Sequence, residues 1–489
     1  MKNFFNPCKT FAAAIIGILL ATFFCGCSER SVILAPATGS TTFWEGHLEK
    51  DRFPLHFYLQ TATDGKQPKM HVTASRPRWA GPVDHLKLSG NQLSFRISTR
   101  NVSFSGTIAS NTITGAWNEE PYTSWWLTMN SVATPAFMFT RQHPWPPFPY
   151  LVEEVTIPGT GNRPNLAGTI TRPAEPGSFT AILLLNGQHA QGRDSECYYH
   201  RPFLVWADHL TGNGLIVLRC DDRGVGDSEG IFNEATTADF AADASACIDF
   251  LKRRAEVTKI GILGHSEGGL VAAMVASECR SVDFLVLLAP PVFPISREWE
   301  QQAPSINRRK GTNERQADLR RKFIAEAWQK LVAISNGNAG KAVFREFYTS
   351  FLAGLSEEDR VMIGFPPTKE GQIGIEKDLQ EWCSPWMLFM ATFDPAASYR
   401  GISCPVLGIF AGLDESILPE PNAAELEKHL RSGQCPSFKI RTFPDFDHQM
   451  RRPVSHASAT YPLAETVATE TLSLVTDWLK SQLQAPDSH

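Results

Sequence analysis

The sequence predicts two folded units of different classes: a small all-β domain, followed by a larger α/β domain built on a mostly parallel sheet. Residues 43–139 contain short stretches of alternating apolar and polar residues, separated by turn residues and without a helical period. From residue 150 onward, apolar strand-like runs alternate with helical patterns, as in a sheet covered by helices. A strand–turn–helix pattern around Ser266 indicates where the chemistry of the second unit lies.

Length and composition fit an ordinary globular protein of two or three domains. The chain has 489 residues, of which 43% are hydrophobic and 20% are charged. Nucleic-acid binding usually requires a strongly basic face. The net charge of −5 gives no indication of one, so no nucleic-acid partner is expected. The 10 cysteines show neither CxxC pairs nor metal-ligand spacing. We therefore expect no metal site, and most cysteines are predicted to be small buried residues with at most a few disulfides.

Residues 1–27 have the pattern of an export signal: lysines, then an almost wholly apolar run over 11–24, then small residues. The apolar run is short for a helix that crosses a bilayer. Residues 23–28 resemble the lipobox of bacterial lipoproteins, which implies acylation of Cys27 and a membrane-anchored lipoprotein of a bacterial cell envelope, facing the periplasm or the outer surface. A plain cleaved signal peptide or an uncleaved anchor is the alternative. Residues 28–40 are predicted to be a tether.

The first folded unit, residues 41–140, is predicted to be the β domain. Its strand-like segments are 55–59, 93–97, 102–104 and 112–114. Four tryptophans either fill its interior or form a face that stacks on carbohydrate, and we favour the interior, which needs no ligand. These tryptophans are Trp44, Trp117, Trp125 and Trp126. The Pro-rich segment 141–150 is predicted to be a stiff linker.

The second unit, residues 151–485, begins with a hairpin-like pattern and continues with buried strands that alternate with helices. The apolar runs lie at 181–185, 215–219, 259–263, 284–288, 404–411 and 438–443. Between about 292 and 384 the chain departs from this pattern and reads as a helical cap inserted into the domain. One face of its 341–355 segment is aromatic and aliphatic, and this face either lines an acyl pocket or packs the cap onto the core.

Ser266 stands between an apolar run and an Ala-rich helical pattern. Gly264 and Gly268 lie two residues before and two residues after it, where backbone from both arms of a sharp turn leaves no room for a side chain. Such a turn exposes the serine hydroxyl above a helix N-terminus. The pattern therefore predicts that Ser266 is a nucleophile.

Several motifs together resemble the α/β-hydrolase superfamily, and in particular bacterial two-domain carboxylesterases with an N-terminal β domain, related to serine aminopeptidase-type hydrolases. They are Asn186-Gly187-Gln188 with Arg193-Asp194, Asp222-Arg223-Gly224-x-Gly226-x-Ser228, Gly264-His265-Ser266-Glu267-Gly268, and Ser384-Pro385-Trp386 with Asp394-Pro395. The resemblance covers about residues 40–482. It implies the α/β-hydrolase fold.

In that fold the catalytic residues follow one another in the order Ser, Asp, His. Asp414 follows the 404–411 strand, and His448 lies in the loop after the 438–443 strand. We expect Asp414 to orient His448, and His448 to act as the base for Ser266. The competing acids are Glu415, Asp445 and Asp447.

The same fold logic predicts an oxyanion hole made of two backbone N–H groups, those of Glu267 and Gln188. The alternative for Gln188 is that Gly187 and Gln188 only turn the chain. The side chains of His265 and Glu267 are expected to be structural, because the turn directs them away from the serine face.

The sequence thus favours a serine hydrolase that cleaves carboxylic esters through an acyl-enzyme intermediate, with a small-molecule ester or acyl substrate and without cofactor or metal. One alternative is a serine peptidase of the same fold, of the aminopeptidase or prolyl-peptidase kind. An alternative of another class is a non-catalytic envelope-binding lipoprotein.

Overall fold

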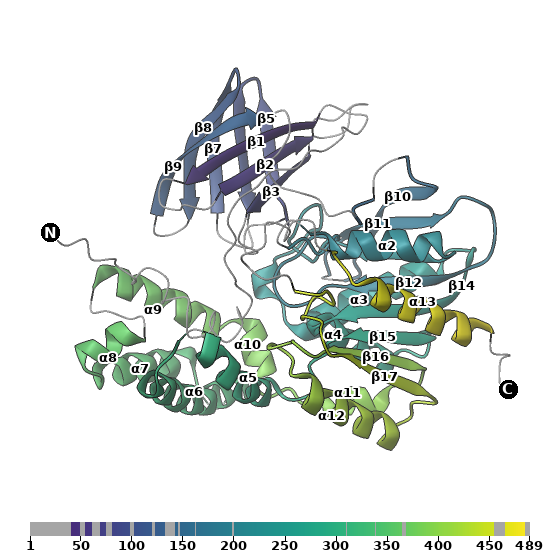
Figure 1. Ribbon diagram of the computed structural model, residues 1–489. Coiled ribbons are helices and arrows are strands. Elements are labelled where there is room, and N and C mark those ends of the chain that lie inside the picture. The colour runs from purple at the N-terminus through teal and green to yellow at the C-terminus, as the bar shows by residue number, and fades with distance from the viewer. Residues whose placement is uncertain are drawn as a thin grey trace.

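The computed structural model of the chain describes residues 41–48, 54–60, 69–74, 81–97, 102–119, 123–132, 142–144, 147–161, 163–197, 200–309, 311–337, 339–363, 368–453 and 465–484. Two sheets organise them, a nine-stranded antiparallel sheet and an eight-stranded, mostly parallel one (Figure 1). The export signal, the lipidated Cys27 and the tether that the sequence predicts lie outside the described residues.

The first sheet is an antiparallel meander whose strands pair in chain order. Its strands are β1 (Thr41–Leu48), β2 (Pro54–Gln60), β3 (Lys69–Ala74), β4 (Gly81–Pro82), β5 (Asp84–Ser89), β6 (Gln92–Ile97), β7 (Val102–Ala109), β8 (Thr112–Glu119) and β9 (Thr123–Val132). The first strand also pairs with the last. β4 pairs with β3 and β5 pairs with β6, while Val83 alone separates β4 from β5. The two ends of the sheet therefore meet in one continuous segment, and the sheet closes on itself as an up-and-down barrel.

Side chains fill the interior of this barrel. Phe95 stacks on Phe104 at 5.2 Å between ring centroids and meets Trp117 edge-on at 6.1 Å. Trp44 and Trp117 are buried. Trp126 points to the opposite face, because neighbours along a strand alternate, and its side chain is 55% exposed. The tryptophans are thus divided between the interior and the surface, and the two buried ones agree with the core interpretation.

The second sheet has the strand order β10-β11-β13-β12-β14-β15-β16-β17. Its strands are β10 (Tyr150–Ile157), β11 (Leu166–Pro173), β12 (Phe179–Leu185), β13 (Ile216–Cys220), β14 (Val257–His265), β15 (Phe284–Leu288), β16 (Val406–Ala411) and β17 (Phe438–Phe443). β10, β11 and β13 pair antiparallel, and every other pair is parallel. β15 and β16 are apolar and buried along their whole length, because both faces of a parallel sheet are covered by helices. This architecture confirms the predicted fold class.

Helices pack on this sheet in two groups. One group is α2 (Pro202–Gly212) beside α13 (Thr469–Gln484). The other is a row formed by α3 (Thr237–Lys252), α4 (Glu267–Glu278), α11 (Ala396–Gly401) and α12 (Pro419–Ser432).

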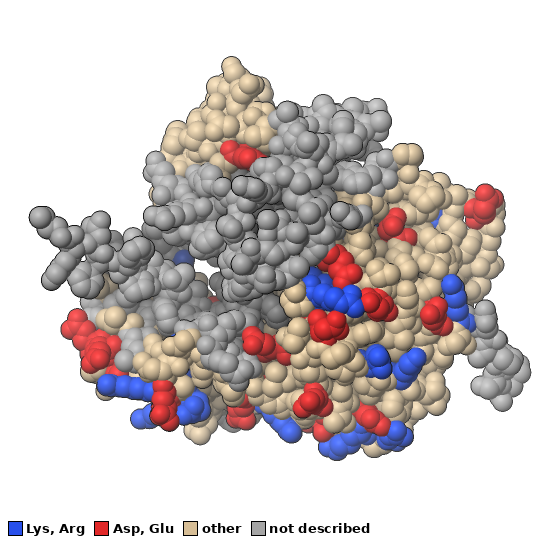
Figure 2. All heavy atoms as spheres, viewed as in Figure 1, with Lys and Arg blue, Asp and Glu red and all other residues tan. Residues whose placement is uncertain are grey.

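On the face shown in Figure 2, basic side chains lie beside acidic ones. Exposed ion pairs such as Arg345–Glu376 contribute little to stability.

A helical cap lies between β15 and β16. It contains α5 (Ile295–Arg309), α6 (Glu314–Ser335), α7 (Lys341–Ala353), α8 (Glu357–Met362), α9 (Lys369–Trp382) and α10 (Pro385–Met390). Phe323, Phe344, Tyr348 and Trp382 are fully buried and meet ring to ring. The partly buried Phe347 and Phe351 contact Phe323 as well. The aromatic face of α7 therefore packs against other helices of the cap.

Candidate active site

Ser266 occupies a sharp turn between β14 and α4. Its backbone has φ 53° and ψ −122°, a conformation that costs energy in a residue with a side chain. The surrounding backbone holds it there: Ser266 N donates to the Leu288 carbonyl at 2.8 Å, and the Ser266 carbonyl accepts from Gly269 N at 2.9 Å. Strain kept by such contacts is typical of a functional position.

The flanking glycines are required by space. A Cβ on Gly264 would lie 2.2 Å from the Gly268 carbonyl oxygen, and a Cβ on Gly268 would lie 2.3 Å from the Leu185 carbonyl oxygen. A side chain at Gly264 would force the two arms of the turn apart, and a side chain at Gly268 would push the turn away from the end of β12. The structure thus gives the physical reason for the spacing seen in the sequence.

Asp414 and His448 meet in the loops after β16 and β17. Asp414 Oδ2 accepts a hydrogen bond from His448 Nδ1 at 2.6 Å, and both side chains are buried. Asp414 Oδ1 accepts from the backbone N–H groups of Ser416 and Ile417 at 2.7 and 2.9 Å. The carboxylate therefore has a fixed orientation, and a histidine that donates from Nδ1 keeps its lone pair on Nε2.

The environment tunes His448 for proton transfer. Burial lowers the pKa of His448, but the charge and hydrogen bond of the Asp414 carboxylate, with a further contribution from Asp447, raise it, and the net pKa lies above its ordinary value of 6.5. A raised pKa makes the neutral His448 ring a stronger base toward a hydroxyl proton.

The two nearby aspartates have other partners. Asp445 forms an exposed ion pair with Arg452 at 2.9 Å. Asp447 pairs with the buried Arg451 at 2.8 Å and accepts from Gln449 N. The structure thus brings Asp414, rather than either of these acids, to His448.

His265 has a role at this site that the sequence did not reveal. Its Nε2 lies 2.8 Å from the His448 carbonyl oxygen, and the two imidazole rings pack at 4.7 Å between centroids. Burial, followed by the charge of His448, lowers the pKa of His265 to about 3, so this ring is neutral. The neutral His265 ring therefore donates a hydrogen bond to the His448 carbonyl oxygen and places no positive charge beside the His448 ring. No local pattern could show this contact, because 183 residues separate the two histidines.

Glu267 links the turn to the cap. Its buried carboxylate accepts from Thr237 Oγ1 at 2.6 Å and from Trp386 Nε1 at 2.7 Å, and Trp386 belongs to α10. Burial raises the pKa of Glu267. Its side chain is thus structural, as predicted, while its backbone N–H lies at the N-terminus of α4, where N–H groups have no partner within the helix.

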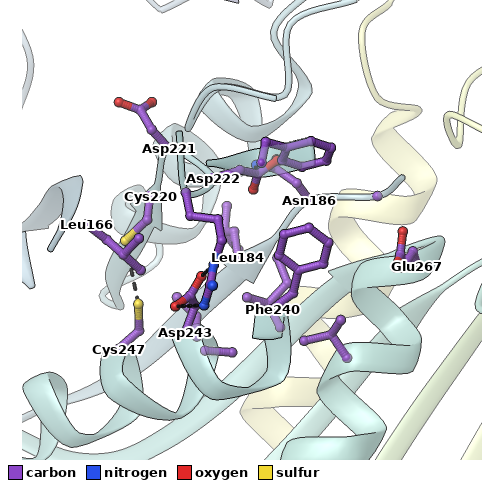
Figure 3. Close-up of a pocket in the computed structure, with 17 residues that line it drawn as sticks. Leu166, Leu184, Asn186, Cys220, Asp221, Asp222, Phe240, Asp243, Cys247 and Glu267 are labelled. Atoms are coloured by element: carbon purple, nitrogen blue, oxygen red, sulfur yellow. Dashed lines mark hydrogen bonds and ion pairs between the residues drawn. The ribbon is translucent and has the colours of Figure 1, made fainter. Parts of the chain in front are cut away.

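The loop after β12 lies against Ser266. A Cβ on Gly187 would lie 3.2 Å from both the Ser266 Cβ and the His265 carbonyl oxygen. Gln188, the predicted oxyanion donor, directly follows this contact in the chain. Beneath this loop lies a pocket lined by Asn186, Asp222 and Glu267 among others (Figure 3).

Within the described residues, no group of three His, Cys, Asp or Glu side chains is arranged to hold a metal ion. In the same part of the chain, no helix is long and apolar enough to cross a membrane. The described cysteines are all free thiols. Two of them, Cys220 and Cys247, place their sulfur atoms 3.7 Å apart at the edge of the pocket.

Comparisons with known proteins agree with this fold. Residues 198–331 match the family described as serine aminopeptidase, S33. The chain is 28% identical over 150 residues to esterase EstD of Thermotoga maritima, which corresponds to 31% of this chain and 35% of that protein. The chain thus matches little more than a third of the length of this curated relative.

The solved structures that the chain is similar to include two esterases. The Pyrococcus furiosus esterase PF2001 is 17% identical with a TM-score of 0.42, over 71% of this chain and 98% of that one. Est1E from Butyrivibrio proteoclasticus with bound ferulic acid is 17% identical with a TM-score of 0.38, over 67% and 99% of the two chains. The predicted resemblance to α/β-hydrolases is confirmed by the family match together with the sheet order of this chain.

Proposed function

We propose that this protein is a serine hydrolase that cleaves carboxylic esters of small molecules, with Ser266, His448 and Asp414 as its catalytic residues. One observation carries the proposal. The hydrogen bond between Asp414 and His448 joins the loops after β16 and β17, and it lies beside the strained turn at Ser266 because His448 packs on His265. A buried and oriented acid–base pair next to a nucleophile turn is the arrangement that serine hydrolysis needs.

The reaction begins when Ser266 Oγ attacks the ester carbonyl carbon while His448 Nε2 takes the hydroxyl proton. The carbonyl oxygen becomes an oxyanion, which accepts hydrogen bonds from the N–H groups of Glu267 and Gln188. As the tetrahedral intermediate collapses, His448 returns the proton to the leaving alkoxide, and an acyl-Ser266 ester remains. A water molecule, deprotonated by His448, then attacks this ester. As the second tetrahedral intermediate collapses, His448 returns the proton to Ser266 Oγ and the acid is released.

Two residues support His448 during these steps. Asp414 holds the ring with Nε2 available and stabilises the imidazolium that forms when His448 takes the proton. His265 holds the His448 backbone carbonyl and stays neutral, so it adds no positive charge beside that imidazolium.

The second candidate function is peptide hydrolysis, which is favoured by the description of the matching family as a serine aminopeptidase. The curated relative is named an esterase. Both reactions use the same acyl-enzyme chemistry and differ in the leaving group, an alcohol or an amine. Direct comparison of the two substrate classes therefore decides between them.

The test is turnover of p-nitrophenyl esters of graded acyl length beside aminoacyl and prolyl p-nitroanilides, with Ser266→Ala as the blank. We expect ester turnover, and we expect a fluorophosphonate to label Ser266. Turnover of the anilides alone would make the protein a peptidase. A protein that neither turns over any of these substrates nor reacts with the fluorophosphonate would be a non-catalytic one.

We also propose that a lipid on Cys27 anchors the enzyme to a bacterial envelope membrane, on the basis of the sequence around Cys27. Metabolic labelling with a radioactive fatty acid tests it. The Cys27→Ala variant should lose the label and should wash from membranes. Equal labelling of the variant and the unaltered protein would contradict the anchor.

A further inference from the structure

The loop at residues 186–195, which carries Gln188, has no helix or strand of its own. It nevertheless presses closely on the turn at Ser266 through Gly187. His189 has φ 74°, which is unfavourable for a residue with a side chain. A strained loop at a site of close contact must be held in place by specific interactions.

Asp222, which follows β13, binds this loop on both sides of Gln188. Its Oδ1 accepts from Asn186 Nδ2 at 3.0 Å, and its Oδ2 accepts from Gln191 N at 2.9 Å. Its own backbone N–H donates to the Gln191 carbonyl at 3.1 Å. Figure 3 shows the Asn186 and Asp222 side chains next to each other at the pocket. One carboxylate thus fixes the residues that bracket Gln188.

Gln191, which is bound by Asp222, in turn binds Gln188. Its Nε2 donates to the Gln188 carbonyl at 3.0 Å, and its Oε1 accepts from Ser195 Oγ at 2.7 Å. With its carbonyl bound on one side and Asn186 bound on the other, Gln188 has little freedom to turn its N–H away from Ser266. An oxyanion donor is effective only when its direction is fixed before the charge develops.

Asp222 lies where burial disfavours the charged form of its carboxyl group. Burial raises the pKa of Asp222 to about 8, although the hydrogen bonds from Asn186 and Gln191 lower it. Both partners donate N–H groups, one to each carboxyl oxygen, so the two oxygens together fix the position of the loop. Titratable groups with a strongly raised pKa cluster at functional sites, which agrees with the position of Asp222 beside the loop that contacts Ser266.

We propose that Asp222 is a positioning residue that fixes the 186–191 loop so that the Gln188 N–H points at the oxyanion. The inference rests on the proposed serine hydrolysis and assigns a further residue to it. The preceding residue, Asp221, holds the far end of the same loop by accepting from Arg193 N at 2.8 Å and from its guanidinium at 2.6 Å. Two consecutive carboxylates therefore clamp the loop.

The test compares Asp222→Asn with Asp243→Asn. Asp243 lines the same pocket but binds Arg223, at 2.7 Å, instead of the loop. With p-nitrophenyl butyrate as the probe, Asp222→Asn should lower kcat about 100-fold, as expected for loss of one oxyanion donor, and should leave KM within about threefold. Asp243→Asn should keep kcat within about threefold, because the donor stays in place.

Gln191→Met is a second variant, which keeps the side-chain length and removes both of its hydrogen bonds. It should lower kcat by a similar factor, and the double variant with Asp222→Asn should be no worse than the poorer single variant, because both act on Gln188. This variant keeps the inference testable if Asp222→Asn fails to fold.

Amide hydrogen exchange gives a readout independent of turnover. Peptides that cover residues 186–191 should exchange faster in Asp222→Asn than in Asp243→Asn or the unaltered protein. Unchanged exchange and unchanged kcat in Asp222→Asn and Gln191→Met, in a protein that does hydrolyse the ester, would overturn the positioning role and leave the hydrolase proposal intact. An unaltered protein that is inactive on every ester would instead remove the proposed function, while the exchange data would still decide whether Asp222 holds the loop.

Discussion

The edge of the second sheet near Asp414 and His448 and the aromatic interior of the cap are both buried, yet the side chains in the two regions make different kinds of contact. At the sheet edge, Asp414, His448 and His265 are polar groups that fix one another by hydrogen bonds. In the cap, rings such as Phe344 and Trp382 only fill space against each other, with centroids 5.6 Å apart. Burial by itself therefore does not identify a functional site. The kind of contact that the buried side chains make does.

The difference can be tested by substitution. Changes at the sheet edge should reduce activity and leave the fold intact, whereas changes in the cap should reduce stability and leave the chemistry of the remaining folded protein intact.

The largest effect is expected from Ser266→Ala and His448→Ala. Each removes a reacting group, so each should lower kcat/KM for p-nitrophenyl butyrate by about 10⁴-fold or more, and the losses should not add in the double variant. Circular dichroism should show a native fold. Full activity of Ser266→Ala would end the serine-hydrolase interpretation.

Asp414→Asn should lower kcat about a thousandfold or more, because the amide no longer orients His448 or stabilises its charge. Asp445→Asn is the matched control, since Asp445 is exposed and bonded to Arg452 instead. It should retain most activity. Loss of activity in the control, with near-normal activity in Asp414→Asn, would transfer the role of the acid to the loop after β17.

Phe344→Ala should destabilise the protein by about 3–5 kcal/mol, because it leaves a cavity in the cap between Tyr348 and Trp382. The neighbouring Val343 is exposed, and Val343→Ala should change the free energy of unfolding by less than about 0.5 kcal/mol. Chemical denaturation measures both. A change in acyl-chain preference without loss of stability would place Phe344 in a substrate pocket.

The smallest effect concerns pH. The base must be neutral to accept the serine proton, so kcat/KM should rise with pH through the pKa of His448, which lies above 6.5. In Asp414→Asn the carboxylate that raises this pKa is lost, and the residual activity should therefore rise at a lower pH. A rise at the same or a higher pH in that variant would contradict the assignment of Asp414 as the partner of His448.

The sequence revealed the turn at Ser266 because its requirements are local. Gly264 and Gly268 are close to Ser266 in both the chain and the structure, so their spacing records a steric rule. The places of the strands along the chain followed in the same way from the apolar runs, each of which contains a strand of the second sheet. The positions of Asp414 and His448 after their strands were also readable, because parallel strands bring their carboxyl ends to one edge.

Only the tertiary structure decided which acid meets His448, what His265 and Asp222 bind, and where the aromatic face of α7 lies. Each of these depends on side chains that approach from distant parts of the chain, such as Asp222 with Asn186 or Trp386 with Glu267. The closure of the β domain depends in the same way on which strands meet across Val83. Local patterns record the steric limits of a single turn, strand or helix, whereas hydrogen bonds between elements exist only after the elements have packed.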